Sequence, residues 1–346
     1  RGRGAPRCGL VARMIKYLGS KRRLIPDILA RIETLKGVNS VCDLFSGTSR
    51  VGQALKRTGR HVHANDHLAF ARVLAETFVA TDSHSVDYAA LTDAIARLNR
   101  LPGKPGYFTQ KFSEEAQFFQ PENAARMDTI RQAIENEPGE LQPILLTSLM
   151  LAADRVDSTT GVQMAYLKQW APRSFEPMVL HTPELLPGPG VATQLDALEL
   201  APLIDADLVY LDPPYNQHRY VGNYHVWETL VLNDQPDTYG KANKRIDVRT
   251  RPSVFNQKRS AREALAELIG SLRCRYLLLS FNDEGYVSLP EIEAMLGAWG
   301  EFQATAIPYR RYVGASIGIH NREGEKVGQV SHLHNHEWLF VAKRSR

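Results

Sequence analysis

Hydrophobic and polar positions follow different periods in different parts of the chain. Short continuous apolar runs, which are typical of buried parallel strands, occur at 41–45, 208–211 and 276–281, with a fourth candidate at 61–64. The first run is followed by a glycine-containing turn and by residues 50–57, whose pattern predicts a helix. Strands that alternate with helices in this way predict an open, mostly parallel α/β sheet.

The middle of the chain has a different pattern. Val86, Leu91, Ile95 and Leu98 recur at helical spacing, and strand-like runs are scarce here. Helices are predicted at 88–98, 121–134 and 143–153. The proline- and glycine-rich stretch 183–190 is typical of a linker that returns to the sheet.

These patterns predict a discontinuous catalytic domain with an inserted helical domain. The predicted parts are a basic extension at 1–13, a sheet domain made of 14–81 and 183–346, and a mainly helical insertion at 82–182. A chain of 346 residues is long enough for one large α/β domain and a smaller insertion.

Composition narrows the class of protein only slightly. The formal net charge of +4 is a weak indication of polyanion binding, so the distribution of charge matters more. The three cysteines lie far apart and the histidines form no ligand pattern, which favours reduced thiols and no metal site. No apolar run approaches the roughly 18 residues of a membrane span, and a cytoplasmic protein is expected.

The sequence Asp212-Pro213-Pro214-Tyr215, directly after the run 208–211, carries the strongest chemical signal. Residues at the carboxyl end of a parallel strand face the ligand crevice, and two prolines remove two backbone donors. Asp212 and the Pro213 carbonyl can each accept one N–H of a planar amine such as adenine N6. The nitrogen lone pair is then free to attack a methyl sulfonium, while Tyr215 stacks on an extruded base. An ordinary Pro-Pro turn is the alternative.

A second signal follows the first predicted strand. Asp43-Leu44-Phe45-Ser46-Gly47-Thr48-Ser49 lies on a strand–turn–helix, where glycine allows the backbone to approach a ligand closely. Asp66, at the end of the next predicted strand, is placed to accept hydrogen bonds from both ribose hydroxyls of a nucleoside. Taken alone, the turn fits a structural glycine turn equally well.

Together these motifs resemble a known family. Asp212–Tyr215, Asp43–Gly47 and Lys16-Tyr17-Leu18-Gly19-Ser20-Lys21 are similar to motifs IV, I and X of the Dam-like (D12 class) adenine-N6 DNA methyltransferases, in the order of the alpha group. The stretches 154–170 and 212–227 resemble most closely the FokI-type modification methylases. The resemblance covers most of the chain from Met14 onward. It departs at Ser49, where the family commonly has a second glycine.

The resemblance implies a class I methyltransferase fold that uses S-adenosylmethionine, with target recognition in the insertion at 82–182. It implies a cofactor site built from Tyr17, Gly19, Lys21, Asp43, Phe45, Gly47, Asp66, Asp196 and Asp212. It implies catalysis at Asp212, Pro213, Pro214 and Tyr215 without a metal, and places Lys16 near the target nucleotide.

Basic residues gather in two segments, 1–23 and 241–262, where they can neutralise phosphates. A solvated charged face is the alternative. The predicted DNA contacts are Lys16, His218, Arg219, Tyr220, Asn223, Tyr224, Lys244, Arg245, Arg249 and Arg251.

The prediction is therefore a site-specific adenine-N6 DNA methyltransferase that acts on double-stranded DNA, with or without a cognate restriction endonuclease. A monomer is expected, since no interface pattern is visible. An RNA adenine methyltransferase, a cytosine-N4 enzyme and a non-catalytic DNA-binding subunit are the alternatives.

Overall fold

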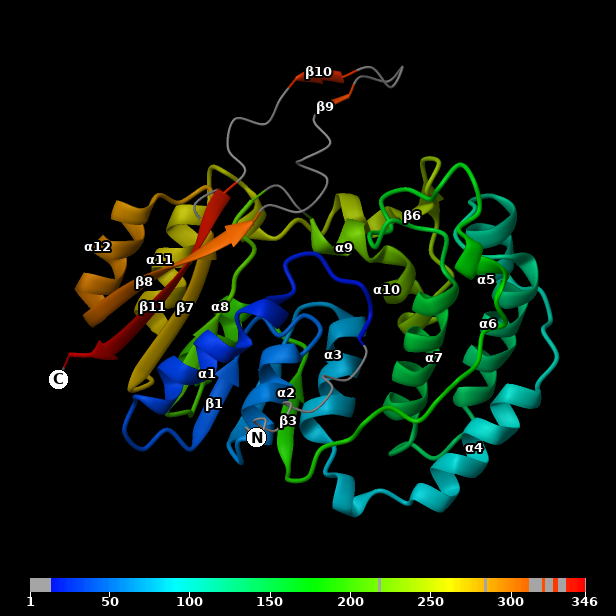
Figure 1. Ribbon diagram of the computed structural model, residues 1–346, viewed down its shortest axis with the longest axis horizontal. Helices are drawn as coiled ribbons and strands as arrows, with labels where there is room; N and C mark the ends of the chain where they lie inside the picture. Colours follow the sequence, from blue (N-terminus) through cyan, green and yellow to red (C-terminus); the bar gives the residue numbers. More distant parts are fainter. Residues whose placement is uncertain are drawn as a thin grey trace, which may run out of the picture.

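The chain folds around a central seven-stranded sheet with the strand order β3-β2-β1-β4-β7-β11-β8 (Figure 1). The computed structural model describes residues 14–216, 219–282, 285–310, 319–320, 326–328 and 334–345, so the predicted extension at 1–13 lies outside it. The strands of this sheet are β1 (Ser40–Asp43), β2 (His61–Asn65), β3 (Gly190–Thr193), β4 (Leu208–Leu211), β7 (Tyr276–Asn282), β8 (Gly300–Arg310) and β11 (His334–Arg344).

The sheet is mostly parallel, as predicted. Strands β3, β2, β1, β4 and β7 run parallel to one another, and β11 is antiparallel to both β7 and β8. All four predicted strands are present, but the first ends at Asp43 instead of Phe45. The backbone turns after Asp43 because the glycine-containing loop begins there. Short hairpins outside the sheet pair β5 (Thr238–Tyr239) with β6 (Lys244–Arg245) and β9 (Ile319–His320) with β10 (Lys326–Gly328).

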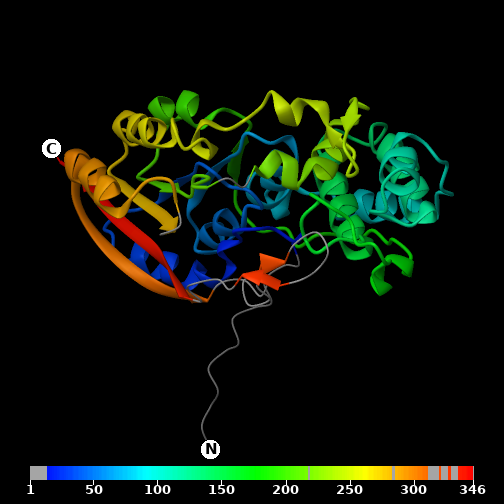
Figure 2. The same ribbon diagram turned by 90° about the horizontal axis from the view of Figure 1, so that it is seen from above.

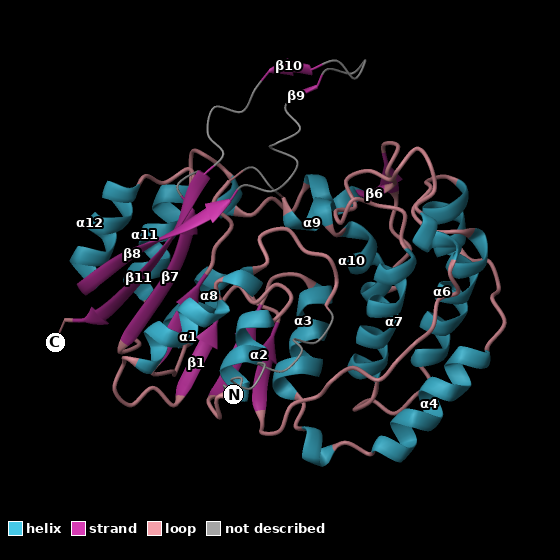
Figure 3. Cartoon of the chain, viewed as in Figure 1, coloured by secondary structure: helices cyan, strands magenta, loops and turns pink. Residues whose placement is uncertain are grey.

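Alternation along the strands fills two separate cores. In β4, Leu208 and Tyr210 pack on one face of the sheet, and Val209 and Leu211 pack on the other. The first face is covered by α1 (Ile25–Glu33) and α2 (Arg50–Arg57), and the second by α8 (Ala197–Leu200), α11 (Ala261–Ser271) and α12 (Leu289–Trp299) (Figure 3). A strand that is buried on both faces reads as a continuous apolar run, which explains why these strands were visible in the sequence.

A group of helices continues the molecule beside the β3 edge of the sheet (Figure 2). Its helices are α3 (Ala69–Ala75), α4 (Tyr88–Arg100), α5 (Tyr107–Thr109), α6 (Pro121–Ile134), α7 (Gln142–Val156), α9 (Tyr220–Asn223) and α10 (His225–Leu232). One apolar core joins most of them, and it includes residues of α3 and α10 outside the predicted insertion. The domain division at 82–182 therefore stays a prediction. None of the helices in the part of the chain that the structure describes is long and apolar enough to cross a membrane.

The topology brings the sequence motifs to one edge of the sheet. Strand β1 pairs with β2 on one side and β4 on the other, so the chain order reverses at β1. A crevice opens outside the carboxyl ends of parallel strands at such a point. The turn after β1, Asp66 after β2 and Asp212 after β4 all lie at this edge.

Candidate active site

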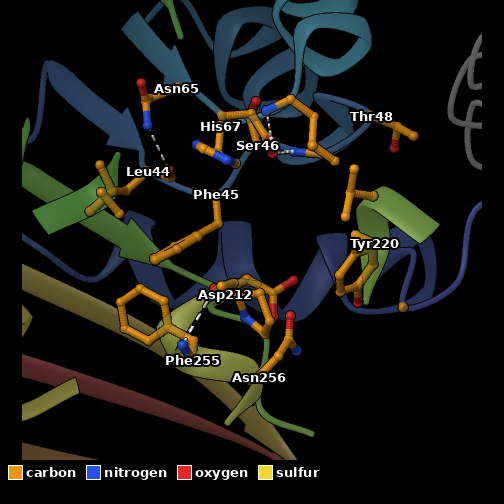
Figure 4. A pocket seen from close by; sticks show the side chains of 18 of the residues that line it. Leu44, Phe45, Ser46, Thr48, Asn65, His67, Asp212, Tyr220, Phe255 and Asn256 are labelled. Carbon is orange, nitrogen blue, oxygen red and sulfur yellow. Dashed lines mark hydrogen bonds between the residues drawn. The ribbon is translucent and has the colours of Figure 1, made fainter. Parts of the chain in front are cut away.

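A cavity of about 390 Å³ lies at the carboxyl edge of β1, β2 and β4 (Figure 4). Every residue of the predicted cofactor site lines it, namely Tyr17, Gly19, Lys21, Asp43, Phe45, Gly47, Asp66, Asp196 and Asp212. These residues are separated by up to 195 positions in sequence, so the fold alone brings them together.

The turn after β1 forms one wall of the cavity. The Ser46 amide donates to the Asn65 carbonyl at 2.8 Å, which joins this turn to the end of β2. Gly47 has a φ of +50°, and a Cβ there would lie 3.1 Å from the Tyr17 hydroxyl. Glycine therefore permits both the backbone conformation and the close approach of Tyr17. Ser49 has a φ of +55°, so a serine adopts the left-handed conformation at the position where the family commonly has glycine.

Two carboxyl groups lie beneath this turn, the half-buried Asp66 and the buried Asp43. Asp66 accepts hydrogen bonds from the amides of Gly47 at 2.8 Å and Leu68 at 3.0 Å, while burial raises its pKa. Asp43 accepts from the Gly52 amide at 3.1 Å through Oδ2, and its Oδ1 has no partner. Burial, with a contribution from Asp212, raises the pKa of Asp43 to about 8.

Lys21 holds Asp212 and a third residue, Glu337, in one ionic network. The Lys21 Nζ lies 3.0 Å from Asp212 Oδ1 and 2.6 Å from Glu337 Oε1. Glu337, on β11, also accepts from Ser280 Oγ at 2.9 Å and Asn282 Nδ2 at 3.1 Å across the β7–β11 pair. Sequence reasoning did not single out Glu337.

The network sets the protonation of its three members. Burial raises the pKa of Asp212 to about 6, although Lys21 opposes this shift. Burial alone would lower the pKa of Lys21, but Asp212 and Glu337 raise it well above its usual range. Burial would likewise raise the pKa of Glu337, but Lys21 and the two side-chain donors bring it below its usual value. Lys21 is therefore an ammonium and Glu337 a carboxylate near neutral pH.

The other members of the Asp-Pro-Pro-Tyr sequence lie around Asp212. Pro214 lines the cavity, whereas Pro213 is buried beside it. The Tyr215 carbonyl accepts from the Tyr286 amide at 2.8 Å, and the Tyr215 ring packs against Phe281 at 5.4 Å. The Lys21 Nζ lies 5.7 Å from the centre of the Tyr215 ring. Tyr215 is thus next to the network but outside the cavity lining.

Stacked tyrosines form the opposite wall. The Tyr17 ring stacks on Tyr220 at 5.4 Å and on Tyr224 at 4.6 Å between centroids. Tyr220 lines the cavity, whereas Tyr224 and its neighbour Asn223 are buried. The backbone amide of Leu18 donates to the Tyr224 hydroxyl. We therefore no longer expect Asn223 and Tyr224 to touch DNA; they support the wall from behind.

Other predicted DNA contacts divide into engaged and exposed groups. Arg245 is buried, with its guanidinium on Asp234 at 2.7 Å and on Asp247 at 3.1 Å, so it is not available to phosphate. Lys16 pairs with Asp157 at 2.9 Å and with Asp154 at 3.3 Å.

Arg219 and Arg249 are exposed, and the Arg249 guanidinium lies 4.0 Å from the centre of the Tyr239 ring. Lys244 is half-buried, and burial lowers its pKa. Arg251 lines the cavity and pairs with Asp247 at 3.2 Å and Glu228 at 3.4 Å. His218 lies outside the described residues.

The segment 250–256 closes the cavity and was also missed as part of this site. Phe255 packs edge-on against Phe45 at 5.3 Å (Figure 4). Asn256 Nδ2 donates to the Asn216 carbonyl at 2.6 Å. On the other side, Asp196 caps α8 by accepting from the Leu198 amide at 2.9 Å.

The cavity suits S-adenosylmethionine. Buried polar atoms without a hydrogen-bond partner gather at the turn after β1, namely Asp43 Oδ1, Ser46 Oγ and Ser49 Oγ. Buried polar groups are normally paired, so these atoms fit a ligand that brings its own donors and acceptors. The carboxyl groups of Asp43, Asp66, Asp196 and Asp212 suit a cationic ligand with sugar hydroxyls.

The mostly parallel sheet with its cavity at the β1–β4 switch point is consistent with a class I methyltransferase. Residues 17–294 match the model of the D12 class N6 adenine-specific DNA methyltransferase family, and the chain belongs to this family. The match confirms the family predicted from the motifs. It also favours adenine in DNA over the RNA and cytosine alternatives, and an enzyme over a non-catalytic subunit.

Curated relatives agree with this family. The chain is 28% identical to the type II methyltransferase M.NlaIII of Neisseria lactamica over 335 residues, which cover 92% of this chain and 98% of that protein. It is 30% identical to the modification methylase StsI of Streptococcus sanguinis, over 88% of this chain. It is 28% identical to the type II methyltransferase M.FokI of Planomicrobium okeanokoites, over 95% of this chain. The chain spans about half the length of the last two proteins, 50% and 53%. It is a site-specific adenine DNA methyltransferase.

Proposed function

We propose that the chain transfers a methyl group from S-adenosylmethionine to N6 of an adenine that is flipped out of double-stranded DNA. The observation that carries this proposal is the position of Asp212 at the edge of a cavity lined by all the predicted cofactor residues. S-adenosylmethionine supplies a methyl group on a sulfonium centre, which is already activated for transfer. The remaining work of the protein is orientation and polarisation of the amine.

Asp212 and the Pro213 carbonyl accept the two hydrogens of the adenine amine. Lys21 engages Oδ1 of Asp212, which leaves Oδ2 for the amine. The two prolines offer no competing donor. The Tyr215 ring, held by Phe281, stacks on the flipped base. The proton that leaves N6 after methylation passes to Asp212 or to solvent.

Asp66 binds the ribose hydroxyls of the methyl donor, because two backbone amides fix its carboxylate at the end of β2. Asp43 Oδ1 accepts from the donor's ammonium group. Phe45 and Gly47 line the methionine part, and Asp196 lies near the adenine amine of the donor.

Duplex DNA lies across the cavity mouth in this proposal. The exposed cations Arg219 and Arg249 contact phosphates, whereas Lys244 is half-buried and Arg245 is buried. Sequence recognition falls in the region 82–182. Type II relatives favour a role in a restriction–modification system with a cognate endonuclease. We further propose that the enzyme acts as a monomer in the cytoplasm.

Replacement of the central carboxylate tests the chemistry. We expect Asp212→Ala to abolish methyl transfer, because the amine loses an acceptor and Lys21 loses one of its two partners. The assay incubates the protein with labelled S-adenosylmethionine and unmethylated genomic DNA, and then maps modified bases by single-molecule sequencing. Methyladenine in one short motif, absent with Asp212→Ala, supports the proposal. Retained turnover in the variant contradicts it.

A further inference from the structure

Arg50 is a cation at the cavity that the proposed chemistry does not use. It is the first residue of α2, directly after the turn Gly47–Ser49, and its side chain lines the cavity. Its Nε is buried and has no hydrogen-bond partner. Burial, and then the nearby Arg22, lower the pKa of Arg50, so its surroundings supply no anion that would stabilise the charge.

The other cations of the cavity are occupied or lie elsewhere. Lys21 is held by Asp212 and Glu337, and Arg251 by Asp247 and Glu228. Arg219 is exposed on the side of the cavity that Tyr220 lines. Among the described residues that line the cavity, Arg50 is therefore a partly buried arginine that makes no ion pair, unlike Lys21 and Arg251.

Hydroxyl groups without partners surround the same turn. Ser49 is fully buried and Ser46 is 8% exposed, and the Oγ atoms of both lack any hydrogen bond. Buried polar groups are normally paired, so the two unpaired hydroxyls of this turn, beside the unpaired Nε of Arg50, indicate a place prepared for a ligand. Hydroxyl donors beside a guanidinium suit a carboxylate.

The methyl donor of the proposed function, on which this inference rests, carries one carboxylate. Its sulfonium, ammonium and ribose hydroxyls match the acidic residues of the cavity, and its carboxylate needs a cation. We propose that Arg50, assisted by the hydroxyls of Ser46 and Ser49, binds the amino-acid carboxylate of the methyl donor. Lys21, the motif X cation, serves Asp212 instead.

Two ligands that differ in the amino-acid part test this role without any turnover. S-adenosylhomocysteine carries the carboxylate, whereas 5′-methylthioadenosine keeps the adenosine and sulfur but lacks the amino-acid part. Dissociation constants of both are measured by titration calorimetry for the wild type, Arg50→Gln, Arg50→Lys and Arg22→Gln. Arg22 is the matched control, because it is an exposed arginine close to Arg50.

We expect Arg50→Gln to raise the dissociation constant of S-adenosylhomocysteine by about 10- to 100-fold, which is the range for loss of a charged hydrogen bond. The same variant leaves 5′-methylthioadenosine unchanged, which also shows that the adenosine site is folded. Arg50→Lys recovers part of the loss, and Arg22→Gln changes neither ligand by more than about 3-fold.

Other outcomes overturn the inference in recognisable ways. Equal weakening of both ligands by Arg50→Gln indicates a structural role. An unchanged affinity for S-adenosylhomocysteine, with weaker binding of duplex DNA, assigns Arg50 to a phosphate instead. A wild type that binds neither ligand contradicts the proposed function together with this inference.

Discussion

At the scale of single residues, the pH at which the enzyme works depends on the charges around Asp212. Asp212 can accept hydrogen bonds from both Lys21 and the target amine only as a carboxylate, and burial raises its pKa to about 6. We therefore expect the rate of methyl transfer to fall as the pH decreases through about 6. Glu337 contributes to that raised pKa and competes for Lys21. Glu337→Gln removes the charge and keeps a polar side chain beside Ser280 and Asn282.

We expect Glu337→Gln to move the acidic limb of the pH–rate profile to lower pH. The pKa of Asp212 falls in this variant, because Asp212 loses a repulsive neighbour and no longer shares Lys21. Turnover at saturating substrates is measured between about pH 5 and pH 8. Lys21 stays charged across this limb, and Asp43, Tyr17, Tyr210 and Tyr220 stay neutral, since the pKa of Asp43 is about 8 and those of the three tyrosines are raised. A limb that stays in place or moves to higher pH refutes this role of Glu337.

Ser49 combines a left-handed backbone with a buried hydroxyl that has no partner. A residue with a Cβ costs about 1 kcal/mol or more in this conformation, whereas glycine adopts it freely. We expect Ser49→Gly to raise the free energy of unfolding of the ligand-free protein by up to about 1 kcal/mol in urea denaturation. Ser49→Ala is the control, because it removes the hydroxyl and keeps the strain. The explanation fails if the two variants are equally stable.

The residues of the site differ in how far the sequence could reveal them. Asp43 ends β1, and Asp66 and Asp212 directly follow β2 and β4, so the predicted parallel strands place all three at one edge of the sheet. Glu337 could not be found in this way. It is a single charged residue within a strand, and its meaning depends on a register that places it opposite Asn282. Local sequence does not specify such long-range pairing.

At the scale of elements, long helices and fully buried strands were predictable, and edge strands were not. Helix α6 spans the predicted residues 121–134, and β4 spans 208–211. Strand β3 has only four half-exposed or exposed residues at the edge of the sheet, so it has no apolar run to find. Strand β8, at the far edge of the sheet, is mostly half-buried or exposed, and its neighbour β11 mixes buried, half-buried and exposed positions, which weakens a signal based on continuous runs.

The basic segment 241–262 shows what a charge count leaves out. Its arginines are conspicuous in sequence, yet Arg245 and Arg251 are turned to carboxylates of the same protein. In β6, Arg245 joins Asp234 to Asp247 and thereby fixes the loop that carries Arg249. Whether a cation serves the fold or a partner depends on packing that no local pattern encodes.

At the scale of the whole molecule, the small net charge of +4 means that DNA binding depends on which cations remain exposed. Arg249 and Arg245 offer a matched comparison, since they are four residues apart and differ in burial. We expect Arg249→Ala to weaken the binding of duplex DNA equally for all sequences. The slope of log K against the logarithm of salt concentration should fall in magnitude by about 1. The free energy of unfolding of Arg249→Ala changes by less than about 0.5 kcal/mol, because the side chain that is removed is exposed.

Arg245→Ala has the opposite signature. It leaves Asp234 and Asp247 without their guanidinium, so we expect a loss of about 2–3 kcal/mol in the free energy of unfolding. Its salt slope stays that of the wild type, because a buried arginine releases no counterion from DNA. Fluorescence anisotropy with a labelled duplex at several salt concentrations, together with urea denaturation of both variants, separates the two roles. A reduced slope with Arg245→Ala, or an unchanged slope with Arg249→Ala, contradicts this division of the basic segment between fold and DNA.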